Sequence, residues 1–144
     1  MSTRRMSFNE TPDWMNRIGF HAAGSIDFDA AASSVVIRKG FLIYGLSLTI
    51  HATVGFVVDS DLAFPVPFIG DALTTYLTIG TDGSIRMDRG DFANVRGVGA
   101  NVPGIRWYTF NGRALIGKCF FRAGFYQGSV VCDDAFWCEF EGGF

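Results

Sequence analysis

Two histidines are the residues of this sequence best suited to proton transfer or metal binding. His21 and His51 are the only two in the chain, and a histidine titrates near physiological pH. Neither has a second imidazole, a cysteine or a carboxylate at the spacing of a zinc site, and no nucleophile elbow places a serine for a catalytic triad. His51 falls on the polar face of a predicted strand. The sequence therefore predicts no catalytic residue and no enzyme.

Three pairs of closely spaced aspartates could supply oxygen ligands to calcium. They are Asp59 with Asp61, Asp88 with Asp91, and Asp133 with Asp134. Calcium is held by carboxylate oxygens of this kind, but aspartate also ends strands by bonding to the nearby backbone. Because the chain has no twelve-residue calcium loop, we favour turn chemistry for all three pairs.

Neither glycine nor cysteine spacing indicates a cofactor site. The run Gly97-Val98-Gly99 lacks the third glycine of a dinucleotide-binding fingerprint, since position 102 is valine. Cys119, Cys132 and Cys138 form an odd set without metal spacing, which is typical of a reduced protein assembled inside a cell. A bridge between Cys132 and Cys138 stays open as an alternative. We expect no cofactor and no metal.

The composition is apolar and poor in charge. Of 144 residues, 49% are hydrophobic, 15% aromatic and 18% charged, with 18 glycines and a net charge of −2. These values exclude a disordered tail, a collagen-like fibre, a coiled coil and a freestanding polybasic nucleic-acid binder. Ordinary domains carry about 25% charged residues, so we infer extensive contacts with other chains.

Adjacent aromatic residues are concentrated near the C-terminus. Neighbours on a strand point to opposite faces, so pairs such as Phe120-Phe121, Phe125-Tyr126 and Phe136-Trp137 cannot both point into one core. One member of each pair must lie on a second face, and exposed aromatic patches usually mark an interface. The candidate interface residues are Phe8, Trp14, Trp107, Tyr108, Phe121, Phe125, Tyr126, Phe136 and Trp137.

Residues 1–20 are predicted to form an arm and a short helix, and residues 21–144 a single β-domain. The polar arm from Met1 to Glu10 should be mobile unless it is docked. Thr11-Pro12-Asp13 has the residues of a helix start, and the helix should stop near Gly19.

Period-two alternation and turn signals predict strands in the rest of the chain. The expected strands are Ser34 to Arg38, Phe41 to Tyr44, Leu46 to Val58, Leu73 to Ile79, Ser84 to Met87, Ile105 to Phe110, Arg113 to Phe121, Phe125 to Cys132 and Phe136 to Phe140. The second and third could form one long strand bent at Gly45 and Gly55. Hairpin turns are expected at Thr81-Asp82-Gly83 and, most clearly, at Asn111-Gly112.

Three further segments carry weaker signals. Ser25 to Ala32 is either a connection or a weak edge strand, Phe64 to Phe68 an extended loop because of its two prolines, and Asp91 to Gly104 a long loop. The apolar run from Phe41 to Val58 alternates like a strand, so we reject a membrane-spanning helix there. About eight or nine strands at this spacing predict an all-β, antiparallel β-sandwich or jelly-roll-like barrel.

Charge alternates in blocks along the chain. Residues 1–39 sum to +1, 40–85 to −4, 86–122 to +5 and 123–144 to −4. Complementary patches of this kind can bring identical subunits into register. Pairing of opposite charges between adjacent strands of one sheet is the alternative.

These features predict a structural, self-assembling protein rather than an enzyme. A bacteriophage virion component fits this description by fold-level analogy, as a capsid decoration or cement, tail or fibre protein assembled in the host cytoplasm. Its expected partners are copies of itself and other virion proteins, without direct contact to nucleic acid or a membrane. The alternative is a carbohydrate-binding module or lectin that uses Trp107, Tyr126 or Trp137 with loop aspartates.

Overall fold

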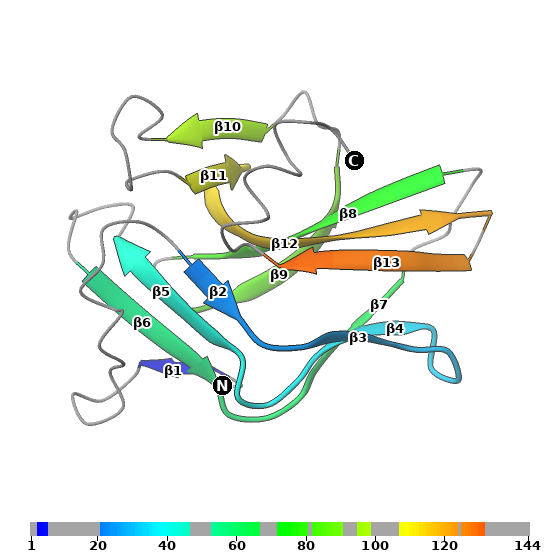
Figure 1. Cartoon of the computed structure of the whole chain (residues 1–144), viewed down its shortest axis with the longest axis horizontal. Helices are drawn as coiled ribbons and strands as arrows, with labels where there is room; N and C mark the ends of the chain where they lie inside the picture. Colours follow the sequence, from blue (N-terminus) through cyan, green and yellow to red (C-terminus); the bar gives the residue numbers. More distant parts are fainter. Residues whose placement is uncertain are drawn as a thin grey trace.

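The computed structural model describes residues 3–5, 21–46, 53–66, 72–80, 82–90, 95–98, 107–123 and 125–131. Within these ranges every regular element is a β-strand, and every strand pair is antiparallel. The strands form three sheets, which we call sheets A, B and C (Figure 1). The all-β, antiparallel class expected from the sequence is confirmed for this part of the chain.

The order of strands in each sheet is as follows. Sheet A contains β1 (Thr3–Arg5), β6 (Thr53–Val58), β5 (Leu42–Leu46) and β2 (His21–Ala23). Sheet B contains β3 (Ile26–Asp29), β4 (Ser34–Ile37) and β7 (Leu62–Pro65). Sheet C contains β10 (Val95–Val98), β11 (Trp107–Phe110), β12 (Arg113–Arg122), β8 (Ala72–Ile79) and β9 (Ile85–Arg89), with β13 (Phe125–Val131) also paired to β12.

Sheets A and B are two halves of one three-stranded ribbon that bends sharply in the middle (Figure 1). Strand β2 continues into β3, β4 into β5 and β6 into β7, and the strand order is the same on both sides of the bend. We call the bend the corner. Each strand is therefore counted twice, which is one reason why the strands outnumber the eight or nine expected.

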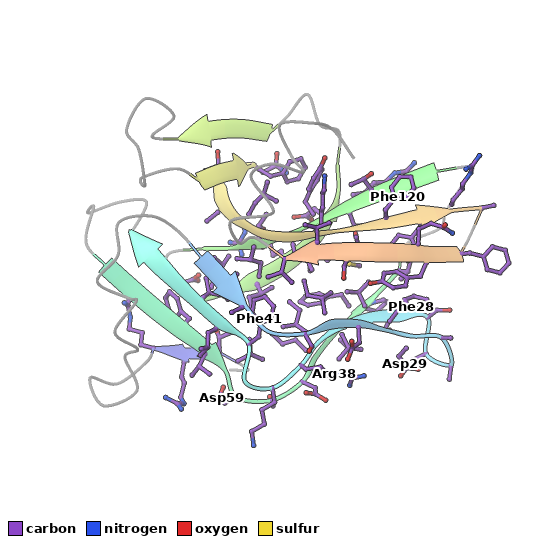
Figure 2. All side chains as sticks on the ribbon, viewed as in Figure 1. Phe28, Asp29, Arg38, Phe41, Asp59 and Phe120 are labelled. Carbon is purple, nitrogen blue, oxygen red and sulfur yellow. The ribbon has the colours of Figure 1, made fainter. Side chains whose placement is uncertain are left out.

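Backbone hydrogen bonds continue through the corner. The Arg38 N–H donates to the Ser25 carbonyl at 3.1 Å, the Gly40 N–H to the Val58 carbonyl at 2.7 Å, and the Val58 N–H to the Phe41 carbonyl at 2.9 Å. Figure 2 shows Phe41 on the side of the ribbon that faces sheet C, and it is fully buried. The corner is thus part of the packed structure and not a loop between separate sheets.

Arg38 ties the central strand of the corner to both of its neighbours. Its Nε donates to Asp27 Oδ2 at 2.8 Å and a terminal nitrogen donates to Asp61 Oδ2 at 3.2 Å. The Lys39 N–H donates to Asp61 Oδ1 at 2.7 Å. This backbone bond, followed by Arg38, holds the pKa of Asp61 below its ordinary value of 3.8.

Strand β12 is the centre of sheet C. One edge pairs with β8, and the other edge is shared by β11 near Arg113 and by β13 from Gly117 onward. Opposite β8, Leu115 pairs with Thr78 and Gly117 with Leu77, so Ile116 is the extra residue of a bulge. A bulge bends its strand, and sheet C curls into half a barrel at this point (Figure 1).

One hydrophobic core joins the three sheets. Its largest fully buried side chains include Phe41, Phe121, Ile37, Ile43 and Leu77. Cys119 also lies in this core, and burial raises the pKa of its thiol to about 12, partly offset by the hydroxyl of Thr75. The thiol is therefore neutral at physiological pH.

Several expectations from the sequence are confirmed in the described ranges. Both predicted hairpins are present, between β8 and β9 and between β11 and β12. At the second turn Asn111 and Gly112 have φ angles of 53° and 74°, which suit a type I′ turn. Ser25 to Ala32 contains the edge strand β3, one of the two readings of that segment.

Other expectations are wrong. Leu46 and Thr53 do not belong to one long strand, because β5 and β6 pair with each other and the chain reverses between them. Phe64 lies in strand β7, not in a loop, since Pro65 comes last in an edge strand where a donor is dispensable. Val95 begins strand β10 inside the supposed long loop.

The N-terminal arm is docked over part of its length. Thr3–Arg5 forms β1 on the edge of β6, so these residues satisfy the condition under which the arm was expected to be ordered. The short helix expected from Thr11 to Gly19 and the strand expected from Phe136 to Phe140 lie outside the described residues.

Candidate association surface

The nine candidate interface residues fall into three groups in the structure. Phe8, Trp14, Phe136 and Trp137 lie outside the described residues. Trp107 and Tyr108 lie in β11, but only their backbone is described. Phe121, Phe125 and Tyr126 belong to the β12–β13 hairpin, and their side chains can be placed.

Phe121 is a core residue, which corrects its assignment to an interface. Its side chain is fully buried and belongs to the main hydrophobic core. The physical reason is the register of β12, since Phe121 lies on the same face as Cys119, which points into the core.

Phe125 is the exposed aromatic residue of this hairpin. Its relative exposure is 72%, and it is the only large hydrophobic residue found exposed in the part of the chain whose side chains are described. Arg122, Ala123 and Gln127 around the turn are also exposed. The hairpin turn lies at one end of the molecule (Figure 1). Interfaces are marked by contiguous apolar patches, so this one ring supplies a single candidate contact and is not a patch by itself.

Three aromatic rings pack together at the base of this hairpin, and we call them the ring cluster: Phe28, Phe121 and Tyr126. Phe28 of β3 stacks on Tyr126 with centroids 5.0 Å apart and an interplanar angle of 10°. Phe121 meets Phe28 edge-on at 5.9 Å and Tyr126 at 5.7 Å. The cluster joins sheet B to β12 and β13, so the base of the Phe125 hairpin is held by aromatic packing.

The hydroxyl of Tyr126 extends this connection. It donates to Ser129 Oγ at 2.9 Å, and Ser129 Oγ donates to the Ile26 carbonyl at 3.3 Å. Burial raises the pKa of Tyr126. Because Phe28 covers one face of the ring and Ser129 engages its hydroxyl, Tyr126 is a poor sugar-stacking platform, which weakens the lectin alternative at that residue.

Alternation of adjacent aromatics is confirmed for the two pairs whose side chains are described. Phe121 is buried while Phe120 is only partly buried, and Tyr126 packs on the core while Phe125 is exposed. Figure 2 shows Phe120 on the opposite side of sheet C from Phe28. Sequence reasoning overlooked Phe28 as a ring that packs against the core, although its spacing from Ile26 is the period-two signal of a strand.

A β-bulge in β13 disfavours the pairing of its edge with another strand. Phe120 pairs with Gly128 and Phe121 with Tyr126, so Gln127 is an extra residue in a bulge. Bulges in edge strands disturb the row of backbone donors and acceptors that a further strand would need. A contact at this end is therefore expected to involve side chains, with Phe125 at its centre.

Asp59, Asp61 and Asp82 make turn or ion-pair contacts. Asp82 Oδ1 accepts from the Ser84 hydroxyl at 2.7 Å and from its N–H at 3.0 Å, and these bonds lower the pKa of Asp82. Asp59 lies 3.8 Å from Arg4, and Asp61 binds the corner as described above. Within the described ranges no group of three or more metal-ligating side chains occurs.

Two ion pairs in the described ranges connect the ends of neighbouring strands. Arg4 with Asp59 and Arg38 with Asp61 each join the first charge block of the sequence to the second. This supports pairing inside the molecule for these two blocks, one of the two readings of the charge pattern.

Comparisons with protein-family models, with curated proteins and with solved structures find no match to this chain. A search of the described residues for a helix long and apolar enough to cross a membrane finds none. The Phe41 to Val58 run, rejected above as such a helix, contains strands β5 and β6.

Proposed function

We propose that this chain is a non-enzymatic structural protein whose copies associate through the end of the molecule that carries Phe125. The observation that supports this is the 72% exposure of Phe125 on a hairpin held firmly by the ring cluster. Burying one phenyl ring contributes about 2 kcal/mol. A single ring therefore makes a weak contact, and symmetric repetition of the contact would make it stable.

For the fold we propose the finer description of an antiparallel β-sandwich or jelly-roll-like barrel. Sheet B packs across sheet C through Phe28 and Tyr126, which supports two facing layers. The curl of sheet C at Ile116 supports partial closure into a barrel.

The biological setting that we propose is a bacteriophage virion, as a capsid decoration or cement, tail or fibre protein. The support is the apolar, aromatic-rich composition together with the antiparallel β-architecture, an analogy at the level of fold. Such a protein would be assembled in the host cytoplasm and would contact copies of itself and other virion proteins.

The test is the substitution Phe125→Ser, with size-exclusion chromatography and light scattering as the measurement. We expect the wild-type chain to be oligomeric at micromolar concentration and Phe125→Ser to shift toward the monomer. Because the ring is exposed, the urea midpoint of unfolding should change little.

Two control variants accompany this test. Gln127→Ser alters a nearby exposed residue without removing apolar surface, and it should leave association unchanged. Phe121→Ala removes a fully buried ring and should lower the free energy of unfolding by about 3–5 kcal/mol. A monomeric wild-type chain, or an oligomer that Phe125→Ser does not weaken, would contradict the proposal.

A further inference from the structure

The first residues of the chain occupy the outer edge of sheet A. In β1, Thr3 pairs with Val58, Arg4 with Val57 and Arg5 with Phe56 on β6. Figure 1 shows β1 beside β6, at the side of the sheet opposite β2. A segment that adds a strand to an existing sheet in this way uses the geometry of β-strand addition, in which main-chain bonds bind the peptide and side-chain sites select it.

The site that holds this strand, which we call the seat, consists of the edge of β6 and the β8–β9 turn. It has a distinct position for each side chain of β1. Thr3 is 6% exposed, and its hydroxyl donates to the Gly83 carbonyl at 2.5 Å in the β8–β9 turn. The Arg5 guanidinium lies 5.1 Å from the centroid of the Phe56 ring, and Arg4 lies 3.8 Å from Asp59. The seat therefore fits a small hydroxyl residue followed by two cations.

Gly83 makes room for this arrangement. Its φ of +86° is a left-handed conformation, and a Cβ built there would lie 2.8 Å from the Phe56 ring and 3.2 Å from Thr3 Oγ1. Only glycine allows the turn to approach both the ring and the incoming hydroxyl. The β8–β9 turn of sheet C thus closes one end of the seat formed by β6 of sheet A.

Without β1, strand β6 would be an unpaired edge strand that could pair with strands of other chains. Its sequence is Thr-Val-Gly-Phe-Val-Val, which contains no charged residue and no proline. An uncovered apolar edge of this kind recruits other strands. β1 supplies a short cover with two arginines, and every copy of the chain carries the same cover.

The connection from β1 to β2 is much longer than its own sheet requires. Arg5 lies opposite Phe56 and His21 opposite Tyr44, whose partner is Gly55, so Arg5 and His21 lie at nearly the same level on opposite edges of sheet A. They are three strand spacings apart, about 14 Å. Residues 6–20 join them, and fifteen residues can reach about 50 Å when extended.

We propose that the edge of β6, together with the β8–β9 turn, is a strand-binding site that takes residues 3–5 of a second copy, so that two copies exchange their first strands. The second copy rests on the proposed self-association, whereas the seat rests on the contacts above. Exchange forms the same bonds between chains that are otherwise formed within one chain, so it costs little. A strand linked to its own sheet by the chain is present there at an effective concentration on the order of 1 mM, so exchange becomes favourable at the concentrations reached inside an assembly.

Mixing two variants that each carry one introduced cysteine tests the exchange directly. Both carry Cys132→Ser and Cys138→Ser, while Cys119 stays because it is buried. One adds Arg4→Cys and the other adds Val57→Cys together with an affinity tag. These positions are paired in the register, so after incubation at about 1 mM a mixed disulfide in excess of random oxidation requires one copy's strand to occupy the other copy's seat.

The control replaces Arg4→Cys with Arg5→Cys. Position 5 is adjacent in sequence but points to the opposite face of the sheet from Val57, so it reports random oxidation. We expect the tagged heterodimer in several-fold higher yield with Arg4→Cys than with Arg5→Cys. Equal yields from the two mixtures would overturn the exchange.

A peptide experiment tests the seat without requiring self-association. A chain lacking residues 1–5 is mixed with a synthetic peptide of residues 2–8, or with the same peptide carrying Thr3→Val. We expect the native peptide to raise the melting temperature by several degrees and the Thr3→Val peptide to raise it less. No shift with the native peptide would overturn the seat.

The two proposals can fail separately. Peptide binding by the chain lacking residues 1–5, together with a full-length chain that light scattering finds monomeric, would leave the seat standing and remove self-association. An oligomer dissociated by Phe125→Ser, with no excess of the mixed disulfide, would leave self-association standing and remove strand exchange.

Discussion

Two threonines on β8 have equal burial but different hydrogen bonding. Thr75 and Thr78 are both fully buried. Thr78 Oγ1 accepts from Arg113 Nε at 3.0 Å, whereas Thr75 Oγ1, opposite Cys119, makes no hydrogen bond of full geometry. A thiol is a weak hydrogen-bonding partner, so the Thr75 hydroxyl beside Cys119 recovers little of the hydration that burial removes, which costs about 1–3 kcal/mol. The same residue type therefore stabilises the strand at one position and weakens it at the other.

Replacing each threonine with the isosteric valine should have opposite effects. We expect Thr75→Val to raise the free energy of unfolding by about 1 kcal/mol, because a buried hydroxyl whose nearest partner is a weakly bonding thiol is removed. Thr78→Val should lower it by about 1–2 kcal/mol, because Arg113 loses an acceptor in a partly buried site. Urea denaturation of the two variants measures both, and a loss of stability in Thr75→Val would show that its hydroxyl is satisfied in solution.

Turn residues in the sequence predicted the hairpin between β11 and β12. The reversal between β5 and β6 could not be predicted because such residues are absent there. Asn111-Gly112 fixes a two-residue turn by its φ preferences, so that hairpin could be located from the sequence. Residues 47–52 contain no glycine, proline, asparagine or aspartate, so nothing in the local pattern announced the reversal between β5 and β6. Alternation identified the strand residues there but not their pairing.

Single edge strands were also missed for a physical reason. β7 contains Pro65 and β10 contains Gly97, and both residues weaken a central strand while an edge strand tolerates them. The position of a segment at an edge depends on contacts distant in sequence. For the same reason, alternation predicts that one ring of each aromatic pair points outward but not which one. Phe125 and Tyr126 are both candidates, and in the other pair the candidate is Phe121, although it is buried.

The bonds of Asp61 at the corner should make the free energy of unfolding depend on pH in the acid range. Since the pKa of Asp61 is lower in the folded chain than its ordinary 3.8, the unfolded chain takes up a proton first as the pH falls. The stabilisation from Asp61 is present above pH 4 and is lost as the pH falls from about 4 through the folded-state pKa. We expect Asp61→Asn to show a smaller drop in urea midpoint between pH 7 and pH 3 than the wild-type chain shows.

A neighbouring variant serves as the control for this comparison. Ser60→Ala changes an exposed residue of the same turn and keeps every carboxylate, so its pH dependence should match the wild-type chain. An unchanged drop in Asp61→Asn would mean that the acid sensitivity arises from other carboxylates.

The packing of the whole molecule depends on a close approach between sheets B and C. Gly117 of β12 faces Ile26 of β3, and a Cβ at position 117 would lie 2.9 Å from Ile26 Cδ1 and 3.0 Å from the Val130 carbonyl. The layers can be this close because β12 has no side chain at this point. Gly117 thus determines the spacing between the two sheets.

Adding one methyl group at this contact should force the sheets apart. We expect Gly117→Ala to lower the free energy of unfolding by about 1–3 kcal/mol through overpacking. Ile26→Val removes Cδ1, so Gly117→Ala should cost less in the Ile26→Val background. A double-mutant cycle by urea denaturation measures this coupling, and strictly additive effects would place the strain at the Val130 carbonyl instead.

The long sequence separations described above have a consequence for synthesis of the chain. Ser129 bonds to Ile26 across 103 positions, and Thr3 bonds to Gly83 across 80. A ribosome adds about 5–20 residues per second, so the apolar side of the N-terminal ribbon waits roughly 5–20 seconds for the strands that cover it. We expect the nascent chain to need chaperone protection in that interval, and production in a heterologous host to respond more to growth temperature than the stability of the finished molecule would suggest.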